Sequence, residues 1–361
     1  MNMVNGSLES RRTVLSRSAG VGIAMPTIGS VMPFPEPAAA SAGQTLWDLW
    51  TGDKPAAAFG CARAGLAALL APRGVNRVWA PAYACAALAE AFAGLETRWF
   101  NLGSDLEPDC DGLAAGVRSG DAVVAIDYFG RPPGIEFRAL AASRPDVLWI
   151  EDCAQAADTG IKPWGDVVLF SPRKIIGVGD GAVLVGEGGL PAPFGAPPPP
   201  AGAQIARAVD PQGVSPQTWY PSFQAQEATF TTDNGRMSAE TLAHLKTQPA
   251  APIRAARRAN ARHLAASLQD LALWPRDPFD YAPLAFPIRI RKRDEVASRL
   301  AEAGIFCAQH WAELASPAAD FPHLHRLAAA QLSLPCDQRY GRGDMDRIIS
   351  AVRDIGVEPI D

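Results

Sequence analysis

The sequence predicts an α/β protein in which a large domain with a mostly parallel central sheet is followed by a smaller C-terminal α/β domain. Short, wholly apolar runs such as 122–126 and 167–170 alternate with Ala- and Leu-rich runs such as 62–71. Strands that are apolar on both faces are typical of a parallel sheet covered by helices on both sides. The chain has 361 residues, of which 48% are hydrophobic and 20% charged, and this length suggests about two domains.

The elements of the large domain follow from apolar runs and the residues that end them. A helix is expected at 62–71, ending before Pro72, and a second at 84–93, ending at Gly94, a residue common just after helices. A shorter helix is expected at 135–142. Strands are expected at 75–80, 97–100, 122–126, 147–150, 167–170 and 182–185. Residues 186–214 contain four consecutive prolines and are expected to form a surface excursion.

The C-terminal part repeats the α/β pattern on a smaller scale. Helices are expected at 238–247, 253–269, 294–303 and 343–355, and strands at 284–290 and 332–335. Four arginines, Arg254, Arg257, Arg258 and Arg262, are placed on the polar faces of the second of these helices, which is more typical of a solvated face than of a ligand site. The domains are therefore expected at 46–250 and 251–361, after an N-terminal arm at 1–45.

Composition argues against several classes of function. The formal net charge of −5 does not favour a nucleic-acid-binding protein with a broad basic surface. No uninterrupted apolar run reaches the ~18 residues typical of a membrane-spanning helix. The six cysteines are scattered, without a Cys-x-x-Cys pair, so they indicate reduced thiols, and no metal site is expected.

The first 42 residues allow two interpretations. Arg11 and Arg12 precede a mildly apolar run at 19–32 and small residues at 38–42, which is the pattern of a twin-arginine export signal and its cleavage site. Pro26 interrupts the apolar run, which favours instead a basic arm ahead of a cytoplasmic domain. We therefore expect a cytoplasmic protein, with a periplasmic one as the alternative.

Polar residues follow three of the predicted strands. Asp127 comes after 122–126, Asp152 and Gln155 come after 147–150, and Ser171 and Lys174 come after 167–170. Because ligands of open parallel sheets bind beyond the carboxyl ends of the strands, these groups are expected to converge at one edge.

Pyridoxal phosphate is the cofactor that needs this combination. It requires a lysine for a Schiff base, an acid that keeps its ring nitrogen protonated, and hydroxyl or backbone donors for its phosphate. Taken alone, Asp152 is more typical of a helix N-cap and Lys174 of a solvated loop. Their order along the chain, with Gln155 and Ser171, is much more specific than either residue.

These motifs resemble the DegT/StrS-type sugar aminotransferases, which are fold-type I pyridoxal-phosphate enzymes. The core of the resemblance is Glu-Asp-Cys-Ala-Gln at 151–155, Phe-Ser-Pro-Arg-Lys at 170–174 and Gly-Asp-Gly-Ala at 179–182. It extends to segments on both sides, at 60–64, 80–83, 128–130, 234–237, 304–305 and 332–335, and spans residues 55–355.

The resemblance implies a role for each site residue. Lys174 would form the Schiff base and then move protons, Asp152 would pair with the ring nitrogen, and Gln155 would lie against the ring or its 3′-oxygen. Ser171 and the backbone of Cys61 and Ala62 would bind the phosphate. Asn234 would reach the phosphate of a neighbouring subunit, which implies a homodimer with shared active sites. Either Tyr83 or Cys85 would lie against the ring, and Tyr83 is favoured.

The expected function is transfer of an amino group, from glutamate, to a keto group of a nucleotide-linked sugar or related metabolite in polysaccharide or antibiotic biosynthesis. Lys174 argues against the dehydratase branch of the family, in which His replaces it. Two departures, Cys61 in the phosphate turn and Asp127 where the family commonly has His, leave open a non-sugar acceptor in secondary metabolism. A non-catalytic regulator on the same fold is the third possibility.

Overall fold

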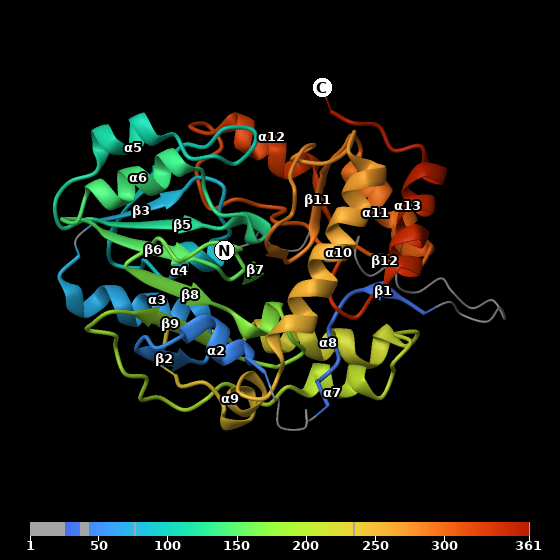
Figure 1. Ribbon diagram of the computed structural model, residues 1–361, viewed down its shortest axis with the longest axis horizontal. Coiled ribbons are helices and arrows are strands. Elements are labelled where there is room, and N and C mark those ends of the chain that lie inside the picture. Colours follow the sequence, from blue (N-terminus) through green and yellow to red (C-terminus); the bar gives the residue numbers. More distant parts are fainter. Residues whose placement is uncertain (1–25, 37–42, 76, 234, 361) are drawn as a thin grey trace, which may run out of the picture.

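A seven-stranded sheet with the order β2-β9-β8-β6-β5-β3-β4 forms the centre of the large half of the molecule (Figure 1). The computed structural model describes residues 26–36, 43–75, 77–233 and 235–360. Five strands run parallel: β3 (Arg77–Pro81), β4 (Glu96–Phe100), β5 (Ala122–Ile126), β6 (Leu148–Asp152) and β8 (Val167–Phe170). β9 (Ala182–Gly186) runs antiparallel to both of its neighbours, β8 and β2 (Ala56–Phe59). The predicted α/β fold with a mostly parallel sheet is confirmed.

Helices cover both faces of this sheet, as the alternation of its side chains requires. In β8, Val167 and Leu169 face the core that contains α3, whereas Val168 and Phe170 face the core that contains α2. The helices of this half are α2 (Leu46–Thr51), α3 (Ala62–Leu70), α4 (Ala86–Glu90), α5 (Cys110–Gly116), α6 (Ile135–Ser143) and α9 (Ala239–Leu245). Short 3-10 turns follow α3, β5 and β8, at Ala71–Arg73, Tyr128–Gly130 and Pro172–Lys174.

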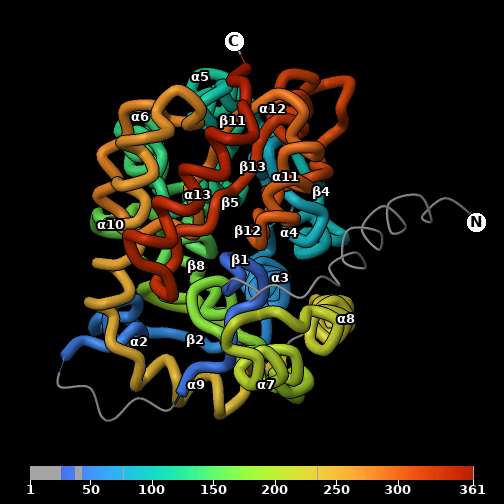
Figure 2. The backbone as a smooth tube through the Cα atoms, turned by 90° about the vertical axis from the view of Figure 1, so that its right-hand side faces the viewer, coloured from blue at the N-terminus to red at the C-terminus, as the bar shows by residue number. Residues whose placement is uncertain are grey.

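The second half packs its helices around a separate apolar core (Figure 2). Its antiparallel pair is β11 (Phe286–Arg289) with β13 (Gln331–Leu334). Its helices are α10 (Ala250–Leu268), α11 (Arg293–Glu302) and α13 (Arg342–Ile355). α12 (Pro322–Ala330) lies between them in the sequence but buries Leu324, Leu327 and Ala328 in the core of the large half. The short strands β7 (Ala156–Asp158) and β10 (Ala282–Pro283) pair with each other and so connect the two halves.

The proline-rich excursion contains more regular structure than the sequence indicated. α7 (Gly202–Ala208) lies inside it, and α8 (Pro216–Glu227) follows and packs against α7. Neither helix was predicted from the sequence, and α8 contains Pro216 at its start and Pro221 in its interior. A proline at the first helical position lacks only an N–H that has no partner there, so Pro216 is compatible with the start of α8.

Residues 26–36 belong to the fold. β1 (Ile28–Gly29) runs parallel to β12 (Ile305–Phe306), and Ile28 and Val31 are buried. The segment then crosses the loop after Lys174, where a Cβ on Gly177 would lie only 1.7 Å from the carbonyl oxygen of Pro33. Part of the predicted arm is therefore packed against both halves. The twin-arginine motif and the small residues at 38–42 lie outside the described residues.

The arginines of α10 are not all solvated. Arg254 and Arg258 pair with Asp158, and Arg262 pairs with Asp280. Arg257, however, is 0% exposed, so the expectation of a solvated face is wrong for this residue. It faces the interior because the helix packs against both halves of the molecule.

α10 has 19 residues, and no helix in the described part of the chain is long and apolar enough to cross a membrane.

Candidate active site

The ends of β6 and β8 bring Asp152 and Lys174 together. Asp152 is the last residue of β6 and lies opposite Leu169 of β8. Lys174 follows Leu169 by five residues and is the last residue of the 3-10 turn Pro172–Lys174. Asp152 is buried, and its Oδ1 accepts a hydrogen bond from the Ala154 N–H at 2.9 Å. Burial raises the pKa of Asp152, and the positive charge of Lys174 partly offsets this rise. The charge of the predicted amine, Lys174, therefore acts on the predicted acid, Asp152.

The loop after β8 is fixed on both sides of Lys174. Ser171 is buried just before the 3-10 turn. After the turn, Asp180 accepts hydrogen bonds from the Ser238 N–H and hydroxyl, both at 2.7 Å, and from the Thr241 hydroxyl. These contacts attach the loop to the start of α9, so Lys174 is presented from a rigid segment.

The side-chain amide of Gln155 uses its oxygen in a hydrogen bond and leaves its nitrogen without one. Its Oε1 accepts a hydrogen bond from the Phe129 N–H at 2.6 Å, which fixes the side chain. Its Nε2 is buried and has no hydrogen-bond partner in the described part of the chain. A buried donor without a partner is costly, and such groups are often completed by a ligand. The Nε2 group therefore fits the acceptor oxygen of a bound cofactor.

The expected phosphate turn precedes α3. Cys61 is the N-cap residue of this helix, but its side chain does not cap it, because its Sγ lies 3.3 Å from the carbonyl oxygen of Thr231. The first N–H groups of the helix are thus left without a side-chain acceptor, which suits an anion. A cavity of about 140 Å³ adjoins Gly60 and Cys61 and is closed in part by Pro198.

Tyr83 lies in the interface between the two halves. It is fully buried, its hydroxyl donates to the carbonyl oxygen of His310 at 2.6 Å, and its ring packs against Tyr128 and Trp311. Burial raises the pKa of its hydroxyl. Cys85, the alternative ring contact, is half-buried at the start of α4. Of the two, Cys85 therefore keeps more free surface.

The remaining predicted residue, Asn234, lies outside the described residues. The segment that follows it runs beside the phosphate turn of its own chain: the Gly60 N–H donates to the carbonyl oxygen of Gly235 at 2.8 Å, and Phe59 bridges to Arg236.

Sequence reasoning missed His310. This residue follows β12 in the second half, and its Nδ1 lies 2.8 Å from the Ser333 hydroxyl. Burial and then the charge of Lys174 lower the pKa of His310 to about 3, so the imidazole is neutral at physiological pH. No local motif marks His310, although the expected strand at 332–335 carries its partner Ser333.

These groups together fit pyridoxal phosphate. Lys174 would supply the amine, Asp152 the acid, Gln155 a free donor, and the start of α3 a set of uncapped N–H groups.

Comparison with known proteins agrees with this chemistry. The model of the DegT/DnrJ/EryC1/StrS aminotransferase family matches residues 51–353. No protein of curated function is significantly similar to the sequence.

Solved structures share the fold at low sequence identity. A DegT DnrJ EryC1 StrS aminotransferase from Brucella abortus has a TM-score of 0.61 and 19% identity, covering 86% of this chain and 88% of that one. A putative sugar aminotransferase from Streptococcus pneumoniae, in its PMP form, has a TM-score of 0.65 and 13% identity, covering 91% and 97%. A sugar aminotransferase from Micromonospora echinospora has a TM-score of 0.59 and 17% identity, covering 90% and 100%.

Proposed function

The chain belongs to the DegT/DnrJ/EryC1/StrS aminotransferase family of pyridoxal-phosphate-dependent enzymes, and from this we propose that it moves an amino group from glutamate to a keto group of a nucleotide-linked sugar or related metabolite. The observation that carries the proposal is the placement of Asp152 and Lys174 at adjoining strand ends beside the free amide donor of Gln155. The sugar acceptor is supported by the relative DesI, whose structure was solved with its TDP-sugar product.

Each site residue has one task in this proposal. When bound, the cofactor supplies an electron sink for charge that develops on the substrate carbon. Lys174 holds the cofactor and moves a proton at that carbon, and Asp152 keeps the ring nitrogen protonated. Gln155 donates from Nε2 to the ring oxygen, while Ser171 and the N–H groups of Cys61 and Ala62 bind the phosphate. His310, being neutral, adds no second positive charge beside Lys174.

A visible spectrum tests the cofactor site. The purified protein should absorb near ~410–430 nm after addition of pyridoxal phosphate, and borohydride should fix the cofactor on Lys174. Lys174→Ala should remove the absorbance, while Lys162→Ala, which changes an exposed lysine between β7 and β8, should keep it. A protein that stays colourless, or borohydride labelling of another lysine, would refute the assignment.

A donor and acceptor screen tests the reaction. Glutamate should convert the bound cofactor to its amine form, and nucleotide-linked keto-sugars should reverse the change. Turnover with non-sugar ketones alone would favour the second candidate, an enzyme with a non-sugar acceptor. Its support is the departure at Cys61, whose thiol lies 3.3 Å from the carbonyl oxygen of Thr231 in the turn where the family commonly has a side-chain hydroxyl. Full biological activity of Lys174→Ala would instead indicate a non-catalytic regulator.

The same proposal includes a homodimer with shared active sites. Its support is the exposed apolar surface of the proline-rich region: Phe194 and Val209 are 76% and 83% exposed. Val209→Asp should shift the protein from dimer to monomer in sedimentation. Ile135→Asp, a matched change on α6, should leave the dimer intact. A wild-type protein that sediments as a monomer would contradict this part.

We also propose a cytoplasmic location. Its support is the packing of residues 26–36, because cleavage after the small residues at 38–42 would remove β1 from the fold. Detection of the protein in the periplasm, by fractionation, would favour the alternative.

A further inference from the structure

Two side chains of β13, Gln331 and Ser333, hold the ring of His310. The Ser333 hydroxyl lies 2.8 Å from Nδ1 of His310, and Nε2 of Gln331 lies 2.8 Å from the same hydroxyl. Oε1 of Gln331 accepts a hydrogen bond from the His310 N–H at 3.0 Å. Gln331 and Ser333 are buried, so their polar groups need partners within the protein.

The main chain of His310 fixes the direction of every hydrogen bond in this network. A backbone N–H can only donate, so the Gln331 side-chain oxygen must face it and the Gln331 amino group must face Ser333. The Ser333 oxygen therefore accepts from Gln331. Among the described residues, Nδ1 of His310 is then the acceptor for the Ser333 proton. A proton on Nδ1 would leave the buried Ser333 hydroxyl without an acceptor, which is costly. The neutral ring of His310 must consequently carry its proton on Nε2.

Nε2 is the ring nitrogen of His310 that points away from Ser333. Within the described residues it has no hydrogen-bond partner, and it keeps accessible surface on a half-buried side chain. The ring packs at right angles against the ring of Phe129, with 5.6 Å between their centroids, and the Phe129 N–H holds Gln155. The Tyr83 hydroxyl donates to the carbonyl oxygen of His310. The Nε2–H group is therefore a free donor among residues of the candidate site.

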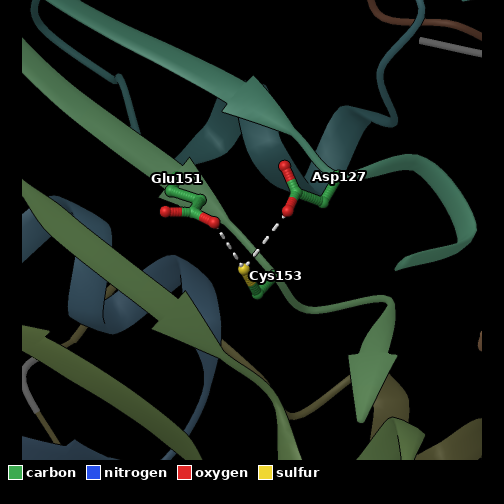
Figure 3. A group of neighbouring side chains, drawn as sticks. All are labelled: Asp127, Glu151 and Cys153. Carbon is green, nitrogen blue, oxygen red and sulfur yellow. Dashed lines mark hydrogen bonds between the residues drawn. The ribbon is translucent and has the colours of Figure 1, made fainter. Parts of the chain in front are cut away.

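The charges around His310 favour an anion at this donor. Burial, and then the positive charge of Lys174, lower the pKa of His310. No carboxylate of the described residues bonds to its ring. At the ends of β5 and β6, Asp127 and Glu151 point instead to the thiol of Cys153, at 3.6 and 3.5 Å (Figure 3). An N–H donor near a positive charge binds a charged acceptor more strongly than a neutral one.

We propose that Gln331 and Ser333 are positioning residues that fix the Nε2–H tautomer of His310, and that this N–H binds the carboxylate of the amino donor. The identity of the ligand rests on the proposed function, whereas the tautomer does not. A neutral donor in one fixed orientation binds the carboxylate without placing a second positive charge beside Lys174.

Nitrogen NMR of the full chain with isotope-labelled histidine tests the tautomer. The chain has five histidines, and the signals of His310 are those missing from His310→Gln. At about pH 7, Nε2 of His310 should be protonated and Nδ1 should not. His323 is an internal standard for this tautomer, because its Nε2 lies 2.9 Å from the carbonyl oxygen of Leu102, which can only accept. A proton on Nδ1 of His310 would overturn the proposal.

Gln331→Glu should reverse the network. A carboxylate at this position only accepts, so it would take the Ser333 proton, and the Ser333 oxygen would then accept from Nδ1–H of His310. The tautomer of His310 should therefore change, while that of His323 stays the same. Because a buried carboxylate is costly, Gln331→Met serves as a second variant. It removes both contacts without adding a charge and should give a mixture of the two tautomers. A pure Nε2–H tautomer in the variants that fold would contradict the role of Gln331.

Conversion of the bound cofactor to its amine form by glutamate tests the ligand. His310→Phe keeps a ring but removes the donor, so the half-saturating glutamate concentration should rise about tenfold or more. Its affinity for pyridoxal phosphate should stay within about twofold of wild type. Gln331→Glu should raise the glutamate concentration similarly, since it turns Nε2 into an acceptor. The control His263→Gln, on α10, should change neither quantity.

Two failures are distinguishable in this experiment. An unchanged half-saturating glutamate concentration in His310→Phe, with normal cofactor binding, would overturn the assignment of the carboxylate to His310. A wild-type protein that binds no cofactor, or that glutamate does not convert, would refute the proposed function instead. The NMR spectra would still decide the tautomer in that case, because they need neither cofactor nor substrate.

Discussion

The Tyr83 hydroxyl donates a hydrogen bond of 2.6 Å to the carbonyl oxygen of His310, and so joins the segment after β3 to the segment after β12. The Tyr128 hydroxyl in turn donates to the carbonyl oxygen of Tyr83. Two halves of the molecule that are distant in sequence therefore meet beside Lys174 through a short chain of buried hydrogen bonds.

Tyr83→Phe should lower the free energy of unfolding by about 1–3 kcal/mol, because the buried carbonyl of His310 loses its donor. Urea unfolding measures this change. Tyr220→Phe, at a half-buried tyrosine on α8, should change stability by less than about 0.5 kcal/mol. Equal stability of Tyr83→Phe and wild type would mean that the contact contributes little.

Arg257→Lys should destabilise the protein by about 2–4 kcal/mol, because lysine cannot reproduce the planar set of donors. Arg257 donates from Nη1 to Pro283 O at 2.7 Å and from Nη2 to Ile175 O at 3.1 Å. Since Ile175 follows Lys174, cofactor affinity should fall as well. The matched control Arg254→Lys changes a partly exposed ion pair with Asp158 and should cost less than about 1 kcal/mol. Similar losses for both variants would contradict the special role of Arg257.

A chain that starts at residue 26 should be more stable than one that starts at residue 43. The longer chain keeps β1 with the buried side chains of Ile28 and Val31, and their burial contributes about 3 kcal/mol or more. Urea unfolding of the two chains, at the same protein concentration, gives the difference. If the two unfold alike, β1 is dispensable.

His310→Gln should reduce the acid sensitivity of the protein. The folded-state pKa of His310 is about 3, below the ordinary value of about 6.5. The wild type therefore has the full contribution of the neutral imidazole above about pH 6.5 and loses it as the pH falls toward about 3. A glutamine has no such loss, so the variant's stability should fall less between pH 6.5 and 4. His263→Gln, on the surface of α10, controls for loss of an imidazole elsewhere, and identical acid curves for His310→Gln and wild type would contradict this expectation.

The parts of the fold that were predictable are those with a local signal. The strands β5 and β8 are apolar on both faces, and the residues that follow them are polar, so their place in the sheet and the meeting of Asp152 with Lys174 follow from the sequence. The family resemblance was confirmed by the match over residues 51–353.

The parts that were not predictable depend on contacts between distant segments. His310 and Arg257 gain their roles from burial against the other half of the molecule, and nothing in their own segments distinguishes them from surface residues. α8 forms despite Pro221, with Trp219 buried and its Nε1 bonded to Asp210 at 3.0 Å. In such cases tertiary packing outweighs the local preference of the sequence.

The crossing of Pro33 over Gly177 links residues 26–36 to the loop of Lys174, the lysine proposed to hold the cofactor, since Gly177 lies three residues after Lys174 and has no room for even a methyl group. A reporter group attached within residues 26–36 would consequently sense events at the lysine from outside the cofactor pocket. By the same route, a fusion partner inserted there would disturb catalysis without touching a single ligand-binding side chain.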